Sequence, residues 1–249
     1  MLEIANISKD FGGLKALHQV SLRLEERQVF GLIGPNGAGK TTLFNLITGL
    51  LPASGGSVKF RGQELTRIRS HEIARLGIAR TFQNIRLFPT MTVLENVLVA
   101  QNIRTRSGVT SLLPVDGPRE KQLGEEAEAL LKQMGLQEKR HEASTSLAYG
   151  EQRRLEIARA LALEPSLLLL DEPAAGMNEA ETQDLLERIR ELRNMGKTVF
   201  LIEHDMSLVM EICHRIFVLN FGELIAHGRP EEIQNNEDVI EAYLGREEG

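Results

Sequence analysis

Residues 34–41 read Gly-Pro-Asn-Gly-Ala-Gly-Lys-Thr, between an apolar run at Gln28–Ile33 and a helical pattern at Lys40–Leu50. This matches the phosphate-binding pattern G-x-x-x-x-G-K-[ST] at every fixed position. Glycines let backbone N–H groups curl around an anion, and the N-terminus of the following helix directs its positive dipole end at the same anion. We therefore expect Lys40 to neutralise β- and γ-phosphate oxygens and Thr41 to ligate Mg²⁺. The nucleotide-binding residues expected here are Gly34, Pro35, Asn36, Gly37, Ala38, Gly39, Lys40, Thr41 and Thr42.

The order of apolar runs predicts an α/β fold with a mainly parallel sheet. Short β-branched or leucine-rich runs alternate with helical patterns, which is typical of strand–helix–strand units. The expected strands are Leu2–Ile7, Val20–Leu24, Gln28–Ile33, Ser57–Phe60, Ile78–Phe82, Leu167–Leu170, Thr198–Ile202 and Ile216–Asn220. The expected helices are Lys40–Leu50, Val93–Gln101, Glu120–Met134, Glu151–Leu163, Glu179–Asn194 and Met206–Cys213, with two short helices in Pro230–Leu244.

Helical patterns interrupt this alternation and predict a helical insertion at about residues 84–155. The α/β core then consists of residues 1–83 and 156–222, and residues 223–249 add a strand and short helices. Glycine and proline residues make Arg104–Arg119 read as a loop.

The composition excludes several classes of protein. No stretch approaches the roughly 18 apolar residues of a membrane helix, and the first residues lack the basic and apolar blocks of a secretory signal. The single cysteine, Cys213, suits a reducing compartment and is expected to be a buried packing thiol. The net charge of −6 argues against binding to nucleic acid. These features predict a soluble cytosolic protein.

Two acidic residues follow the leucine run Leu167–Leu170 directly. Buried carboxylates are costly unless they are paired or bind a metal, and this strand ends at the same sheet edge as the phosphate loop. Asp171 is therefore expected to bind Mg²⁺ directly or to support it from outside its immediate ligands, and Glu172 is the expected general base that polarises the attacking water. Without the phosphate loop, the pair would read equally well as an exposed turn.

With these motifs in place, the chain resembles the ATP-binding subunits of ABC transporters over essentially its whole length. Phe11 lies where that family stacks an aromatic ring on adenine, and Gln83 matches the glutamine that reaches toward Mg²⁺ and the water. His204 matches the switch histidine that contacts the γ-phosphate, and Ala175–Asn178 matches the D-loop. A packing role for Phe11 and a solvated His204 are the alternatives. The resemblance implies a P-loop NTPase fold of the ABC type, with an N-terminal antiparallel β subdomain and a helical signature subdomain.

The stretch Leu147–Gln152 reads L-A-Y-G-E-Q where that family carries its signature, usually L-S-G-G-Q. Ala148 lacks the serine hydroxyl that reaches phosphate, which puts in doubt one hydrogen bond worth on the order of 1–3 kcal/mol. Gly150 is retained at an expected helix N-terminus, and Glu151 is expected to point away from phosphate. The resemblance implies that five residues contact the ATP of a second subunit: Leu147, Ala148, Tyr149, Gly150 and Glu151.

The strings R-T-F-Q-N-I-R-L-F, A-A-G-M-N and D-V-I-E-A-Y-L-G are similar to the ATP-binding subunit of the branched-chain amino acid importer, and to the larger of its two such subunits. The resemblance implies ATP, Mg²⁺, a head-to-tail dimer with an identical or sister ATPase subunit, and a place on the cytoplasmic face of the membrane. Two transmembrane permease subunits and, indirectly, a periplasmic or extracellular binding protein are the other implied partners. Importers of urea or short amides share most of these strings.

Other interpretations stay open at this point. A soluble ABC ATPase of DNA repair or translation tends to carry two nucleotide-binding halves or a long coiled coil, and a P-loop kinase or GTPase lacks the signature. Asn84–Phe88 is the expected contact for a permease coupling helix, with insertion core an equal alternative for Leu87 and Phe88. Arg153 and Arg154 are expected on a solvated or packing helix face rather than as an active-site pair.

Overall fold

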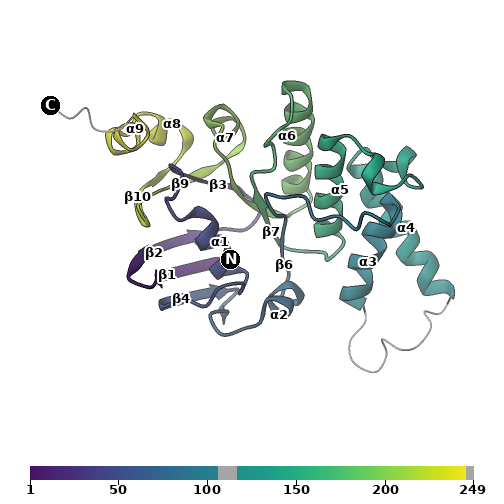
Figure 1. Cartoon of the computed structure of the whole chain (residues 1–249), viewed down its shortest axis with the longest axis horizontal. Helices are drawn as coiled ribbons and strands as arrows, with labels where there is room; N and C mark the ends of the chain where they lie inside the picture. Colours follow the sequence, from purple (N-terminus) through teal and green to yellow (C-terminus); the bar gives the residue numbers. More distant parts are fainter. Residues whose placement is uncertain (106–116, 245–249) are drawn as a thin grey trace.

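The computed structural model describes residues 1–105 and 117–244 and contains two β-sheets with helices around them (Figure 1). An antiparallel sheet has the order β2–β1–β4–β5, and a six-stranded sheet has the order β10–β9–β3–β8–β7–β6. The first comprises β1 (Leu2–Phe11), β2 (Leu14–Leu24), β4 (Gly55–Phe60) and β5 (Gln63–Glu64). The second comprises β3 (Val29–Ile33), β6 (Ile78–Arg80), β7 (Leu167–Asp171), β8 (Thr198–Ile202), β9 (Arg215–Asn220) and β10 (Glu223–Gly228). Its strands are parallel except for the edge strand β10.

The helices fall into groups that Figure 1 separates clearly, with α3, α4 and α5 at the end of the molecule away from α8 and α9. The α-helices are α1 (Lys40–Ile47), α2 (Ser70–Arg75), α3 (Val93–Thr105), α4 (Gly117–Gln133), α5 (Tyr149–Leu161), α6 (Glu179–Asn194), α7 (Met206–Ile212), α8 (Pro230–Gln234) and α9 (Glu237–Leu244). Two 3₁₀ turns, η2 (Gln137–Lys139) and η3 (Ser144–Ser146), precede α5. Among the helices of the described residues, none is both long and apolar enough to cross a bilayer.

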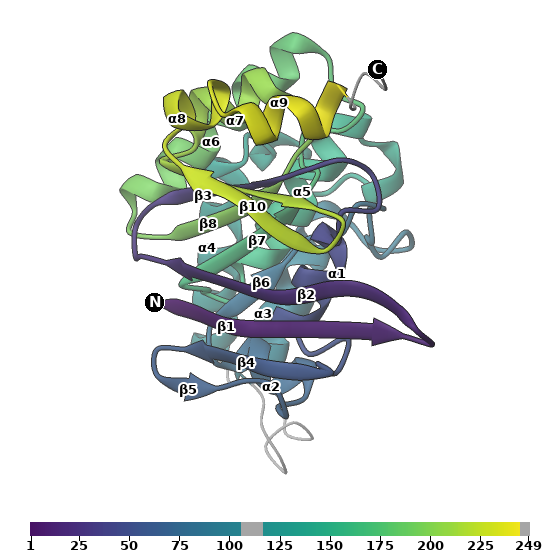
Figure 2. The ribbon, with the colours of Figure 1, turned by 90° about the vertical axis from the view of Figure 1, so that its left-hand side faces the viewer.

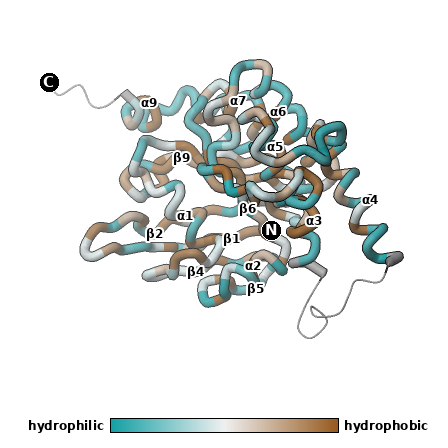
Figure 3. The backbone as a smooth tube through the Cα atoms, turned by 45° about the vertical axis from the view of Figure 1, so that its right-hand side comes forward, coloured by the Kyte–Doolittle hydropathy of each residue, from teal (hydrophilic) through white to brown (hydrophobic). Residues whose placement is uncertain are grey.

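The parallel strands are buried on both faces, which explains their uninterrupted apolar runs. In β3, Val29 and Ile33 join the core cluster that includes the helices α3 to α6, whereas Phe30 and Leu32 join the cluster beneath the antiparallel sheet and α1. Successive strand residues point to opposite faces, so one apolar run serves both cores. The outer helices α4 and α6 show long hydrophilic stretches (Figure 3), as helices with one face in water do. Figure 2 shows the two sheets one above the other, with α8 and α9 across one end.

Most of the expected elements are confirmed, and the differences have local causes. β1 and β2 are longer than expected because Gly12 and Gly13, with φ of 52° and 99°, form a hairpin turn between them. The added strand residues next to this turn are mostly polar, so they gave no apolar pattern in the sequence. α1 ends at Ile47 rather than at Leu50 because Gly49 adopts a left-handed φ of 66°.

Three expectations about element boundaries were wrong or incomplete. The short elements α2 and β5 were not predicted, since α2 buries a single residue, Ile73, and therefore shows no apolar periodicity. The strand expected to reach Phe82 ends at Arg80. The loop expected over Arg104–Arg119 is helical at both described ends, where α3 finishes and α4 begins, and its residues 106–116 lie outside the described part of the chain.

Candidate nucleotide site

Four parallel strands end at one edge of the six-stranded sheet, and each leads into residues that the sequence singled out. β3 enters the phosphate loop, β6 leads toward Gln83, β7 ends at Asp171, and β8 is followed by Glu203 and His204. A cavity of about 300 Å³ opens at this edge. It is lined by Ala16, Asn36, Gly37, Ala38, Gly39, Lys40, Thr41, Thr42, Gln83, Glu172 and His204. The structure thus brings most of the expected nucleotide-site residues together.

The phosphate loop is held in shape by its own lysine. The Lys40 ammonium donates to the backbone carbonyls of Gly34 at 2.6 Å and Pro35 at 3.0 Å. Gly39 has a left-handed φ of 102°, and a Cβ there would stand 2.6 Å from the carbonyl oxygen of Ala16, so the position requires glycine. Burial lowers the pKa of Lys40, and the nearby charges of Glu172 and Asp171 oppose that shift.

Glu172 lies between two side chains that fix both of its carboxylate oxygens. Gln83 donates from Nε2 to Oε2 at 2.9 Å, and His204 Nε2 lies 2.6 Å from Oε1. The Glu172 backbone has a φ of +48°, an uncommon conformation for a non-glycine residue, and its N–H donates to the carbonyl of Ile202 at 2.9 Å. Such strain at a cavity wall is typical of functional positions. Two residues far apart in sequence, Gln83 and His204, therefore converge on the carboxylate of Glu172.

Asp171 lies beneath the cavity and is paired with an arginine. Arg80 Nη2 lies 2.7 Å from Asp171 Oδ2, and the two side chains are only 5% and 3% exposed. The other terminal nitrogen of this guanidinium, Nη1, donates to Asn45 Oδ1 at 2.7 Å. Asp171 Oδ1 is buried without a hydrogen-bond partner among the described residues. Arg80 was not among the residues predicted for this site, since its carboxylate partner lies 91 residues away in the sequence.

Glu203 is a second buried acid at this edge that the sequence analysis did not assign to the site. Its Oε1 accepts from the Ala174 N–H at 2.8 Å, and its Oε2 accepts from the His204 N–H at 3.3 Å. Burial raises the pKa of Glu203, and the charge of Glu172 raises it further against the opposing backbone hydrogen bonds. Glu203 thus ties the residue after β8 to the segment that follows Glu172.

The signature stretch lies away from this cavity in the same chain. Leu147 is 4% exposed and packs in the core, whereas Tyr149 is 45% exposed at the start of α5. Glu151 turns back on its own helix: its Oε2 accepts from the Ala148 N–H at 3.1 Å and pairs with Lys139 at 2.8 Å. Although burial acts to raise the pKa of Glu151, these partners hold it below its usual value. None of the five residues lines the cavity.

Two further expectations concern residues around the site. Phe11 does not line the cavity; it is 44% exposed, with the Lys9 ammonium 4.9 Å from its ring centroid. Arg153, expected on a solvated or packing helix face, is fully buried and hydrogen-bonded to backbone carbonyls, so the solvated alternative is wrong. Arg154 pairs with Asp184 at 2.6 Å, and Cys213 is buried, as expected.

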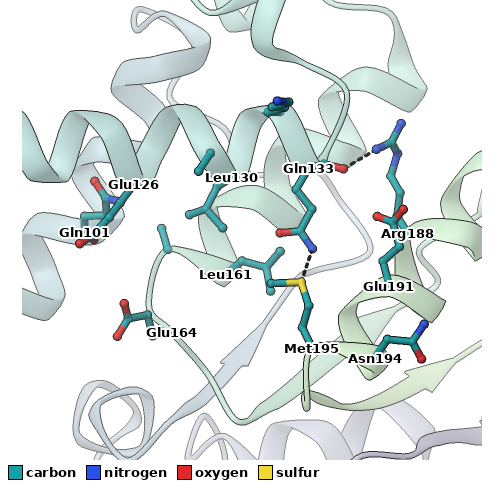
Figure 4. A pocket seen from close by; sticks show the side chains of 13 residues that line it. Gln101, Glu126, Leu130, Gln133, Leu161, Glu164, Arg188, Glu191, Asn194 and Met195 are labelled. Carbon is teal, nitrogen blue, oxygen red and sulfur yellow. Dashed lines mark hydrogen bonds between the residues drawn. The ribbon is translucent and has the colours of Figure 1, made fainter.

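A larger groove of about 870 Å³ lies between α3, α4, α5 and α6 (Figure 4). Its lining includes Leu130, Gln133, Arg188 and Met195 and none of the residues of the phosphate-loop cavity. The candidate site is therefore chosen by its converging polar groups and not by the volume of its cavity.

Comparison with known proteins was informative over the whole chain. The family model described as ABC transporter matches residues 17–175, and the model described as branched-chain amino acid ATP-binding cassette transporter matches residues 223–249. The chain is 49% identical to the high-affinity branched-chain amino acid transport ATP-binding protein LivG of Salmonella typhimurium, over 98% of each chain. It is 47% identical to the corresponding protein BraF of Pseudomonas aeruginosa, again over 98% of each chain.

Solved structures of ATP-binding cassettes are similar to this chain over nearly its whole length. A nucleotide-free ATP-binding cassette from an ABC transporter superposes with a TM-score of 0.87 at 36% identity, covering 98% of this chain and 99% of that one. A dimeric ATP-binding cassette in a post-hydrolysis state with ADP and Pi superposes with a TM-score of 0.80 at 26% identity, covering 92% and 99%.

Proposed function

Because the chain belongs to the ABC transporter ATP-binding family, we propose that it is the ATP-hydrolysing subunit of an importer of branched-chain amino acids. The observation that supports the chemistry best is the Glu172 carboxylate, held between Gln83 and His204 on the wall of the phosphate-loop cavity. Phosphoryl transfer to water depends mainly on positioning and charge stabilisation, and the cavity offers both.

The phosphate loop binds the triphosphate in this proposal. Backbone N–H groups of residues 36–41 and the N-terminus of α1 face the phosphates. The Lys40 ammonium exchanges its bonds to two loop carbonyls for phosphate oxygens, which are better partners for a cation. Its positive charge, favoured by Glu172 and Asp171 against the effect of burial, then offsets charge on the β- and γ-phosphates.

Glu172 acts as the general base. A water oxygen attacks the γ-phosphorus, the bond from phosphorus to the bridging oxygen breaks toward ADP, and the proton of that water passes to the Glu172 carboxylate. Gln83 and His204 orient the carboxylate, each through one of its oxygens. His204, 42% exposed on its side chain, has room to contact the γ-phosphate as well.

The residues present also fit Mg²⁺. Asp171 keeps one buried oxygen without a protein partner among the described residues, while Arg80 takes the other. Proteins usually bind Mg²⁺ with one or two of their own oxygens and share the rest with phosphates and water, so no cluster of three ligating side chains is needed. Thr41, Gln83 and Asp171 would hold the ion, which supplies charge neutralisation on the phosphates.

Two subunits complete each site in this proposal. The signature residues of one chain lie outside its own cavity and would contact the ATP of the partner through the N-terminus of α5. The negative charge of Glu151 would not face the partner's ATP, because its carboxylate is bound by Lys139 and by the Ala148 N–H. A dimer is also the form reported for a similar solved cassette.

The permease subunits would dock in a groove of about 830 Å³ between α2, α3 and α5, which we call the arginine groove. Its lining includes four arginines and one acid: Arg75, Arg80, Arg86, Arg159 and Glu156. The excess of positive charge suits an acidic coupling helix. Phe88, 39% exposed beneath the Arg159 guanidinium, borders it, whereas Leu87 packs against the core. The chain would then sit on the cytoplasmic face of the membrane, with residues 84–155 as its signature subdomain.

The cargo is proposed from the relatives. LivG and BraF are named for high-affinity branched-chain amino acid transport, and the match at residues 223–249 is to a family described in the same terms. Urea or a short amide is the alternative cargo, since its transport would use the same ATP-hydrolysing subunit. A periplasmic or extracellular binding protein would deliver the substrate. Because Glu172→Gln should stop ATP hydrolysis, cells that carry this variant should no longer take up labelled leucine, isoleucine and valine. Intact uptake of all three would contradict this cargo.

Glu172→Gln and Lys40→Ala test the ATPase in vitro. Removing a general base costs about 10²–10⁴-fold in rate, so Glu172→Gln should lower kcat at least 100-fold while retaining ATP binding. Lys40→Ala should weaken ATP binding itself. Glu125→Gln, on the exposed face of α4, is the control and should hydrolyse ATP normally. A Glu172→Gln protein as fast as the parent would refute the assignment, and one that stays monomeric with ATP and Mg²⁺ in size exclusion would refute the dimer.

A further inference from the structure

Arg153 is the largest fully buried side chain of the described residues, with 0% exposure. Arginine is rarely buried unless its donors are used. Here Nη1 donates to the Phe82 carbonyl at 2.6 Å and Nη2 donates to the Gln83 carbonyl at 2.7 Å. The guanidinium therefore bridges two successive carbonyls of the segment that carries Gln83.

Glu156, one turn further along α5, completes the grip on this segment. It lies 3.0 Å from Arg153 Nη1, and its Oε1 accepts from the Phe82 N–H at 3.3 Å. Both backbone groups of Phe82 and the carbonyl of Gln83 are thus bound by α5. We call this pair the Arg153–Glu156 clamp.

The clamp fixes a backbone whose side chain acts in the nucleotide site. The Gln83 amide donates to Glu172 Oε2 at 2.9 Å, so the place of the Gln83 main chain sets whether that bond forms. The same guanidinium also lies 3.3 Å from the Tyr149 hydroxyl in the signature stretch. One side chain therefore touches both the signature and the glutamine segment.

We propose that Arg153 is a positioning residue for ATP hydrolysis, which holds Gln83 against Glu172 from the helix that carries the signature. The proposal rests on the proposed function, since it assigns a role only if Glu172 is the general base. Arginine suits the role because its planar fork donates along two parallel directions to two separate carbonyls. A lysine at this position could hold Glu156 but could not bridge both carbonyls.

Arg153→Met should lower kcat about tenfold to a hundredfold, with the Kd for ATP unchanged within about twofold, because the residue lies outside the phosphate loop. Arg153→Lys should fall between Arg153→Met and the parent. Arg188→Met is the matched control: Arg188 also donates to a carboxylate, Asp184 at 2.7 Å, and to a backbone carbonyl, that of Gln133 (Figure 4). It should leave kcat within about twofold.

A double-mutant cycle separates positioning from plain structural support. In a Gln83→Ala background, Arg153→Met should reduce kcat by no more than about a further twofold, because the side chain it positions is gone. Three outcomes would each overturn the proposal. Arg153→Met could lower kcat equally in both backgrounds, it could leave kcat unchanged as a single variant, or both Arg153 variants could unfold while Arg188→Met folds. If the parent hydrolyses ATP and Glu172→Gln does not, these outcomes refute the role of Arg153 alone; a parent without ATPase activity refutes the proposed function instead.

Discussion

Replacing Arg80 by methionine tests whether the site depends on its buried ion pair. Arg80 and Asp171 meet at 2.7 Å with side chains 5% and 3% exposed, and Arg80 also donates to Asn45 at 2.7 Å. Its guanidinium lies 5.4 Å and 5.0 Å from the ring centroids of Phe44 and Phe82. Methionine keeps the apolar stem in this aromatic setting but leaves the carboxylate without its cation.

The expected loss is large because the remaining charge stays buried. Removing one partner of a buried pair costs about 3–5 kcal/mol. For a chain of this size 1 kcal/mol shifts Tm by about 2–4 °C, so Arg80→Met should lower Tm by about 6–20 °C. Adding Asp171→Asn should recover part of that loss, since it removes the uncompensated charge.

Thermal unfolding and guanidinium chloride titration at neutral pH measure this loss. Arg23→Met is the control, because the Arg23–Glu3 pair spans 3.7 Å with side chains 71% and 53% exposed. A surface pair of this kind contributes about 0–1 kcal/mol. If Arg80→Met destabilises the chain no more than Arg23→Met does, the reasoning from burial is refuted.

Two more predictions concern Glu203 and Gly150. Burial raises the pKa of Glu203 above its unfolded value, so the parent loses stability as the pH rises through the folded value. The Tm of Glu203→Gln relative to the parent should therefore increase as the pH is raised above 4.5, the ordinary pKa of the group, and a constant difference would contradict the shift. A Cβ at Gly150 would stand 2.7 Å from Glu181 Oε1, a carboxylate that can swing aside, so Gly150→Ala should fold and bind ATP but hydrolyse it at least tenfold more slowly. Loss of ATP binding would contradict a role toward the opposite subunit.

The residues of the candidate site that could be predicted share one property: each lies in the segment that follows an apolar strand. Parallel strands end at the same sheet edge, so the loop after β3, Glu172 after β7 and His204 after β8 had to meet there. That Glu151 points away from phosphate stays a prediction, while its pairing with Lys139 was not predicted. The role of Phe11 stays a prediction.

Arg80 and Arg153 could not be placed from the sequence for a physical reason. Asp171, the carboxylate partner of Arg80, lies 91 residues away, and the Gln83 carbonyl lies 70 residues from Arg153, so no local period records either contact. Solvent is the ordinary place for an arginine side chain, even at the end of a short apolar strand such as Ile78–Arg80. Only the tertiary packing that closes the helical insertion against the sheet decides that they are buried.

These two arginines act on one short segment, residues 80–83, from opposite ends. Arg80 joins its start to Asp171 and Arg153 joins its end to α5, so the segment cannot shift without disturbing the Arg80–Asp171 pair, the Gln83 bond to Glu172, or both. Arg80 also lines the arginine groove, where the permease would dock. In the proposed assembly, a helix that seats in the groove and displaces the segment would change the hydrolytic geometry directly, through one buried ion pair and the hydrogen bonds from Arg153 to two backbone carbonyls.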